Sequence, residues 1–222
     1  MKKILVLTGV LIMLAAGVST VYAEQGFGVY MGAGGSYAFE ILDVDQYNGY
    51  YVDEYGVSPD FDSTYGFYAL VGARIPIPEK FRVARMFCFE IEGNYMPGFD
   101  WSGKSQLSKH KGASIEMELD VTTITGAIKF DPKIGDMDIF RPYLLVGGGL
   151  MIGEINTTAS FKGRSASGGN TEYDPCAKVG LGFDYYLTES LSVNMEGTYV
   201  TGFHDLDEVR YFNTSLGLAL HM

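Results

Sequence analysis

Three histidines are the first residues to consider for chemistry, because imidazole exchanges protons near neutral pH. They are His110, His204 and His221. His204 is followed directly by Asp205, and a His–Asp pair near a serine could support nucleophilic catalysis. Neither this pair nor His110, which has serines nearby, has the spacing of an established catalytic motif. We therefore expect His110 and His204 to be solvated loop histidines, place His221 near the periplasmic end of the last strand, and predict no catalytic residue.

A second candidate is the segment 39–63, which is rich in acids and tyrosines and contains no Lys or Arg. Calcium prefers oxygen ligands, so its carboxylates form a candidate cation-binding set: Asp43, Asp45, Asp53 and Glu54. They lack the full spacing of a calcium loop, and a solvated acidic loop is the alternative. The tyrosines also suit contact with an extracellular protein. We predict no resident metal and no cofactor.

Composition excludes several classes of protein. The 222 residues include 16 Lys and Arg against 27 Asp and Glu, a net charge of −11. That balance argues against nucleic acid as a partner, since phosphate backbones need a basic face. Cys88 and Cys176 are too few for a disulfide scaffold or a cysteine zinc cluster, and we expect two free thiols.

The first residues have the layout of an export signal. Lys2 and Lys3 precede an uncharged, mostly apolar run over 4–18, and Val21 and Ala23 then stand at the two positions that a signal peptidase reads. This pattern predicts a secretory signal peptide over 1–23 and one domain over 24–222. An uncleaved membrane anchor is the alternative, but a spanning helix needs about 20 apolar residues.

The rest of the chain alternates between apolar and polar residues, the period of β-strands. We predict eight strands, at about 26–38, 64–76, 85–97, 119–131, 140–152, 174–187, 190–201 and 209–222. Six of them carry one large apolar face and one face of glycine, polar or charged residues. The segment 140–152 is apolar on both faces, so the alternation leaves its phase open.

A soluble sandwich has the same period with the apolar face inward. Three features favour the inverse arrangement: the apolar faces are long, the opposite faces carry few charges, and aromatic residues collect at strand ends. The expected collars are Tyr95, Phe99 and Trp101 at one level and Phe130, Phe140, Tyr143, Tyr185 and Tyr186 at the other. Long connections, at 39–63, 98–118 and 153–173, also alternate with short ones.

In hydrocarbon an unpaired backbone group costs several kcal/mol, so spanning strands must close on themselves. The sequence therefore predicts an all-β fold, an eight-stranded antiparallel up-and-down transmembrane β-barrel. The lumen of such a barrel is just wide enough to be filled by side chains. Its inward set includes Arg74, Glu90, Glu92, Lys129, Lys178, Asp184 and Glu196. We expect these groups to plug the lumen as ion pairs, with unpaired groups in water-filled pockets as the alternative.

The stretch 178–193 resembles the penultimate hairpin of the small OmpA-type outer-membrane β-barrels. Arg141-Pro142-Tyr143, at the start of the fifth predicted strand, and the run 89–92, in the third, also resemble that family. The resemblance covers essentially all of 24–222. It implies a barrel-only member in the bacterial cell outer membrane, inserted by the barrel-assembly machinery. The last strand fits the alternation of that family, although the terminal Met222 departs from its usual Phe and bears on insertion efficiency.

For function, we expect a monomeric integral outer-membrane barrel with a structural or adhesin-like surface role and no catalysis. Its partners would be outer-membrane lipid, lipopolysaccharide and an extracellular protein, and Lys104, Lys109 and Lys111 could meet lipopolysaccharide phosphates. The alternatives are an outer-membrane lipid-modifying barrel enzyme and a small low-conductance channel. The Gly-, Ser- and Thr-rich segment 153–173 is predicted to be a mobile loop, and its composition indicates no particular function.

Overall fold

The computed structural model describes residues 28–40, 62–76, 84–104, 114–132, 139–162, 164–206 and 209–222. Its strands are β1 (Gly28–Glu40), β2 (Thr64–Pro76), β3 (Ala84–Lys104), β4 (Ser114–Pro132), β5 (Phe140–Phe161), β6 (Arg164–Tyr186), β7 (Leu191–Gly202) and β8 (Arg210–His221), with the short 3-10 helix η2 (His204–Leu206) before β8. The predicted signal peptide, the candidate cation set and His110 lie outside the described residues.

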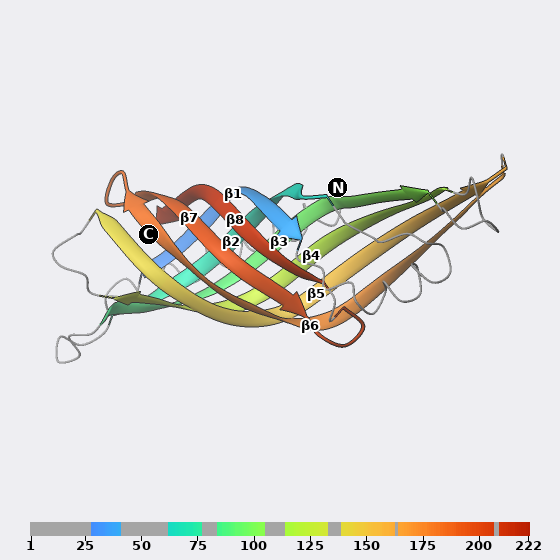
Figure 1. Cartoon of the computed structure of the whole chain (residues 1–222). Coiled ribbons are helices and arrows are strands. Elements are labelled where there is room, and N and C mark those ends of the chain that lie inside the picture. The colour runs from blue at the N-terminus through green and yellow to red at the C-terminus, as the bar shows by residue number, and fades with distance from the viewer. Residues whose placement is uncertain are drawn as a thin grey trace.

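The eight strands form one closed antiparallel barrel (Figure 1). Each strand pairs with its neighbours in the chain, and β1 closes the ring by pairing with β8, from Tyr30 opposite His221 to Glu40 opposite Tyr211. Closure leaves no unpaired strand edge around the ring. The prediction of an all-β, eight-stranded up-and-down barrel is confirmed.

No helix in the described part of the chain is long and apolar enough to cross a membrane.

The two faces of the barrel wall are inverted relative to a soluble protein. Large apolar side chains stand on the outer surface, where Val146 is 60% and Leu181 63% exposed. Charged side chains face the lumen, where Glu90 and Lys178 are each 3% exposed. The alternation predicted from the sequence assigned these faces correctly, because successive strand residues point to opposite sides.

Strand β5, whose phase the sequence left open, turns Tyr143, Leu145 and Met151 into the lumen and exposes Leu144 and Val146 outside. Tyr143 is therefore buried and does not belong to the predicted outer collar. Tyr186, at the end of β6, does not belong to it either, because its hydroxyl contacts Arg74 inside the barrel.

Phe99, also expected in the collar, is buried in the lumen at 1% exposure. The register of β3 against β4 shifts between Met96 and Phe99, and Gly98 adopts a positive φ of 66° there. Such a bulge inserts an extra residue and reverses the faces of the residues that follow. Simple alternation from Tyr95 could not show this reversal.

Four strands continue past the ring at one end, which we call the hairpin end. β5 and β6 remain paired out to Phe161 opposite Arg164, whereas β6 and β7 pair only from Cys176. β3 and β4 pair out to Lys104 opposite Ser114. The result is a protruding sheet, made of 99–104, 114–119, 153–161 and 164–173 (Figure 1).

The prediction of a mobile loop over 153–173 is therefore wrong, and the predicted loop 98–118 is wrong in part. Gly, Ser and Thr suggested a loop because both faces of these strands are polar, so the apolar alternation disappears. Backbone pairing with the neighbouring strand, which leaves no trace in one strand's sequence, holds them instead.

Candidate functional site

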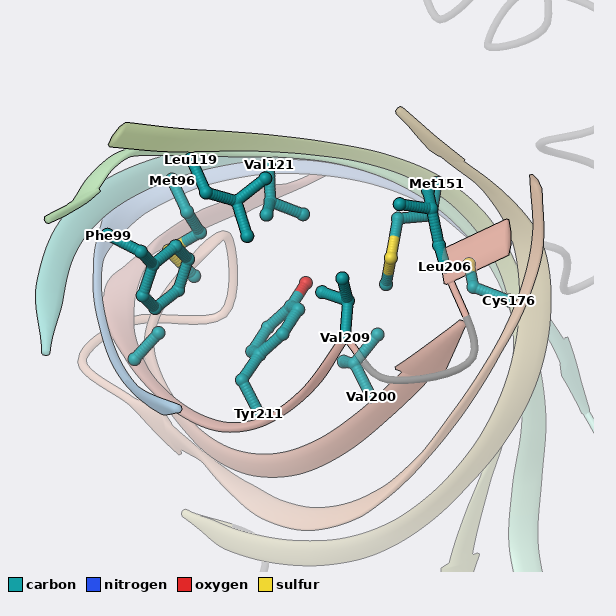
Figure 2. Close-up of a cluster of buried hydrophobic side chains, with 11 residues drawn as sticks. Met96, Phe99, Leu119, Val121, Met151, Cys176, Val200, Leu206, Val209 and Tyr211 are labelled. Carbon is teal, nitrogen blue, oxygen red and sulfur yellow. The ribbon is translucent and has the colours of Figure 1, made fainter. Parts of the chain in front are cut away.

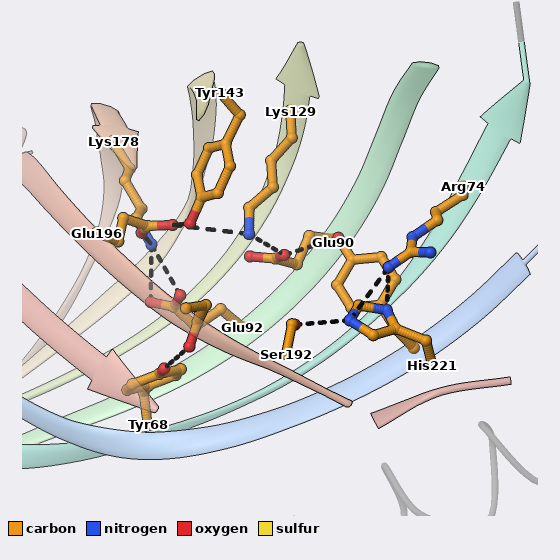
Figure 3. Close-up of polar contacts among 12 residues, drawn as sticks. Tyr68, Arg74, Glu90, Glu92, Lys129, Tyr143, Lys178, Ser192, Glu196 and His221 are labelled. Atoms are coloured by element: carbon orange, nitrogen blue, oxygen red, sulfur yellow. Dashed lines mark hydrogen bonds and ion pairs between the residues drawn. The ribbon is translucent and has the colours of Figure 1, made fainter. Parts of the chain in front are cut away.

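A chain of ion pairs crosses the middle of the lumen (Figure 3). Lys129 Nζ lies 2.7 Å from Glu90 and 3.7 Å from Glu196. Lys178 Nζ lies 2.9 Å from Glu196 and 2.8 Å from Glu92. All five side chains are nearly inaccessible to solvent, so each buried charge has an opposite charge beside it. We call these five residues the ionic chain.

Tyrosines from other strands complete the ionic chain. Tyr30 of β1 donates a hydrogen bond to Glu90 at 2.8 Å, and Tyr143 of β5 donates to Glu196 at 3.1 Å. Lys129 Nζ also lies 4.3 Å from the centroid of the Tyr143 ring. Three carboxylates thus share two ammonium groups and two hydroxyl donors, which spreads the excess negative charge.

The contacts reach across the lumen rather than along its wall. Lys178 of β6 meets Glu92 of β3, and the Tyr68 hydroxyl of β2 donates to Asn194 Oδ1 of β7 at 2.6 Å. Strands on opposite sides of the ring are therefore held at fixed separation. The space that a channel would need is occupied by these side chains.

Two members of the predicted interior set, Arg74 and Asp184, lie at the end opposite the hairpin. Arg74 donates to the Tyr186 hydroxyl at 2.5 Å and to His221, and its guanidinium lies 5.4 Å from the Tyr30 ring. Asp184, together with Arg74 and Asp131, lines a hollow of about 20 Å³. The structure brings five of the seven predicted residues into one chain and places the other two beside it, since Lys129 lines the same hollow.

The sequence did not suggest that His221 and Ser192 would meet, but their side chains lie 2.7 Å apart. The Arg74 guanidinium, which can only donate, contacts both ring nitrogens of His221. The imidazole of a catalytic triad is instead oriented by an acceptor. The Ser192–His221 pair therefore lacks the arrangement of a nucleophile, its base and an orienting group.

An apolar layer fills the lumen toward the hairpin end (Figure 2). It is built from buried residues of seven of the eight strands and of the β7–β8 connection: Ala38, Met96, Phe99, Leu119, Val121, Met151, Cys176, Val200, Leu206, Val209 and Tyr211. These side chains are only 0–7% exposed, so the apolar layer separates the ionic chain from solvent at the hairpin end.

Leu206 and Val209 are the members of the apolar layer that come from a connection rather than a strand. The N–H of Leu206 donates to the carboxylate of Asp174, which is itself buried, at 2.9 Å. A Cβ at Gly202 would lie 2.2 Å from the carbonyl oxygen of Leu206, so only glycine leaves room for this turn. Leu206 is therefore held in one position, where its buried side chain closes the lumen at the hairpin end.

Truncating the Leu206 side chain should admit solvent to the apolar layer. The free thiol of Cys176, only 4% exposed, provides a reporter of that change. In a Cys88→Ser background, Leu206→Ala should raise the rate at which a small thiol reagent labels Cys176 by about tenfold or more, since Leu→Ala in a core costs about 2–5 kcal/mol. Phe203→Ala, in the same connection but already 45% exposed, is the matched control. Equal labelling rates in all three proteins would show that Leu206 does not seal the lumen.

The outer face of the protruding sheet is acidic. Cross-strand pairing sets Asp100 opposite Glu118 and Asp120 opposite Glu154. A hollow of about 310 Å³ over this face is lined by Asp62, Asp100, Ser102, Glu116, Met117, Glu118, Asn156 and Thr158. Like charges directly opposite each other repel, so this face would attract a cationic partner. Within the described ranges, no group of three or more His, Cys, Asp or Glu side chains is placed to hold a metal ion.

No family model and no curated protein matches this chain. Among solved structures, the barrel is similar to a major outer membrane protein from Thermus thermophilus, with a TM-score of 0.55 and 10% identity over 87% of this chain and 99% of that one. It is also similar to Ail, the attachment invasion locus protein of Yersinia pestis (TM-score 0.47, 14% identity, 88% and 98% coverage). A third is the outer membrane protease OmpT from Escherichia coli (0.45, 8%, 90% and 98%). The likeness to the Thermus thermophilus protein shows that this chain has a barrel fold that a known outer-membrane protein also has.

Proposed function

We propose that this protein is an integral barrel of the bacterial cell outer membrane with a surface-interaction role. The observation that carries the proposal is the inverted wall, with exposed Val146 and Leu181 outside and the ionic chain inside. A row of exposed aliphatic side chains costs free energy in water and is stabilised in acyl chains. The closed ring also satisfies the backbone, as hydrocarbon requires.

Aromatic pairs on the outer surface support a membrane-spanning belt between the two ends. Phe87 and Phe130 lie 5.5 Å apart toward one end, and Phe67 and Tyr95 lie 5.4 Å apart toward the other. Aromatic rings collect where acyl chains meet head groups. Export by the signal peptide 1–23, insertion by the barrel-assembly machinery as an OmpA-type barrel, and contact with lipid and lipopolysaccharide are parts of the same proposal.

The hairpin end faces the cell exterior in this proposal, because long connections of such barrels lie outside and short turns in the periplasm. The turn between β6 and β7, around Thr188 and Glu189, is short, whereas the protruding sheet is long. An extended sheet above the lipid provides a surface for a partner, and we propose a monomeric adhesin-like or structural role for it.

Neither alternative role finds support in the lumen. The ionic chain and the apolar layer occupy the path that a channel would use. In the Ser192–His221 pair the imidazole is held by the Arg74 guanidinium rather than by an acceptor, and His204 is exposed in η2 with a positive φ of 54°. We therefore propose that the protein is not catalytic.

Cysteine labelling in whole cells tests the orientation. In a background with Cys88→Ser and Cys176→Ser, Ser167→Cys on the protruding sheet should react with a bulky maleimide that cannot cross the outer membrane. Glu189→Cys, equally exposed but at the opposite end, should react only after the membrane is opened. Labelling of both sites in intact cells, or recovery of the processed protein without surfactant, would contradict the proposal.

A further inference from the structure

One side of β6 is free along the protruding sheet. From Arg164 to Asp174 the strand pairs with β5, and its pairing with β7 begins only at Cys176. Residues 164–171 are all exposed, so no residue in the described part of the chain covers this side. The register with β5 is continuous to the tip, and the segment contains no proline or lysine. Strand edges in soluble surroundings are usually blunted by such residues or by bulges.

The free backbone groups can be assigned from the start of β7. Phe203 N–H donates to the carbonyl of Pro175 at 3.1 Å, so Pro175 turns its carbonyl toward the β7 side. Backbone groups alternate along a strand. The residues that turn their N–H and C=O toward the free side are therefore Ser165, Ser167, Gly169, Thr171 and Tyr173.

The surface beside this edge is open toward the acidic face. The same alternation places Ser165, Ser167, Gly169 and Thr171 on the outer face of the sheet, all of them small. Glu154 on β5 lies opposite Thr171, and on its other side Glu154 lies opposite Asp120 on β4. Strands lie about 4.8 Å apart, so a long side chain on an added strand can cross β6 and reach β5.

We propose that the free edge of β6 binds an extended, basic segment of another protein as an added strand. Main-chain hydrogen bonds to the free groups of 165–173 supply affinity, and Lys or Arg at alternate positions meets the acidic face. This inference rests on the proposed function, in which the protruding sheet lies outside the cell. A second copy of the chain is a poorer occupant, because edge-to-edge pairing would bring two acidic faces together.

Binding of a defined peptide to the full-length protein in lipid nanodiscs tests the proposal. The probe is a fluorescent 12-residue peptide of alternating Arg and Thr, compared with one of alternating Glu and Thr. We expect the Arg peptide to bind and its affinity to fall as salt is raised, since the acidic face attracts it through screened charges. The Glu peptide should not bind.

Two variants distinguish the contribution of main-chain hydrogen bonds at the edge of β6 from that of the acidic face. Ser167→Pro with Thr171→Pro removes two free N–H groups and should weaken binding by about tenfold or more, whereas Ser167→Thr keeps the N–H and should bind as the parent does. Glu154→Gln with Glu118→Gln should weaken binding while leaving the edge intact. Unboiled samples of each variant should migrate as folded barrels on a gel.

Failure of the Arg peptide to bind, equal binding of the Glu peptide, or unchanged affinity in the double proline variant would overturn the proposal. Tighter binding of heparin, a polyanion, than of the Arg peptide would also overturn it. Should the proline variant fail to fold, the Glu154→Gln and Glu118→Gln variant and the salt dependence decide the matter. Labelling of Ser167→Cys on whole cells is independent of these results, so the proposed function can hold when this inference fails.

Discussion

Replacing Lys178 with Met should lower the free energy of unfolding by about 3–5 kcal/mol, as measured by urea titration in lipid vesicles. Lys178 Nζ contacts both oxygens of Glu92, at 2.9 and 2.8 Å, and Glu196 at 2.9 Å. Methionine fills a similar volume but leaves buried Glu92 without a cation and Glu196 with Lys129 alone, at 3.7 Å. The cost is that of the uncompensated charges rather than of lost packing.

A matched double variant identifies that cause. Lys178→Met with Glu92→Gln removes the carboxylate that has lost its cation and should recover part of the loss. Lys162→Met, at the exposed tip of the β5–β6 hairpin, should change stability little. A loss below about 1 kcal/mol for Lys178→Met would mean that water solvates the carboxylates and that the lumen is not plugged.

Alanine at Gly34 should destabilise the barrel by the upper end of the about 1–3 kcal/mol that overpacking costs. Gly34 faces Gly217 across the β1–β8 seam. A Cβ there would lie 2.2 Å from the carbonyl oxygen of Leu216 and 2.6 Å from Gly217 Cα, both backbone atoms of β8. The seam must widen to admit it, and the seam is where the ring closes. Less of the unboiled protein should migrate as a folded barrel, and that fraction should melt at lower temperature.

Gly35 is the control for the Gly34 variant because it is the next residue on the same strand. Its Cβ would point out of the barrel, with Gly66 O at 4.0 Å as its one neighbour within that range. Gly35→Ala should therefore fold and melt like the parent protein. Similar behaviour of the two alanine variants would show that β1 and β8 are not packed as closely as described.

These effects have one physical origin, which is that an eight-stranded lumen has little spare volume. Glycines such as Gly34 let the wall close, and Tyr68 reaches across it to Asn194. The ionic chain then fills the middle and Leu206 closes the hairpin end. The outer surface, by contrast, needs only apolar side chains, so substitutions there should be tolerated more readily.

The sequence by itself determined the number of strands and the side to which most residues point. Both follow from alternation with a period of two, which is a local property of a strand with one apolar face. Phe89 and Ile91 against Glu90 and Glu92 are sufficient to assign β3, and the structure agrees with that assignment. The acids and bases of the lumen could be collected from the same alternation.

Alternation did not predict the structure where a strand has no apolar face, or where a bulge changes the pairing. In β5 and β6 beyond the ring, both faces meet water, so no apolar period marks the protruding sheet. At Gly98 a bulge reverses the faces, and Phe99 turns inward against expectation. Both features depend on pairing with a neighbouring strand, which a single strand's sequence does not record.

Only the tertiary structure decided which charges meet. Lys178 and Glu92 are 86 positions apart and come from strands that are not neighbours in the ring, yet their atoms lie 2.8 Å apart. Such contacts depend on the stagger of every strand pair around the ring, and closure of β1 on β8 sets the sum of those staggers. The free edge of β6 and the position of Leu206 in the apolar layer are also tertiary features, because both depend on where neighbouring strands end.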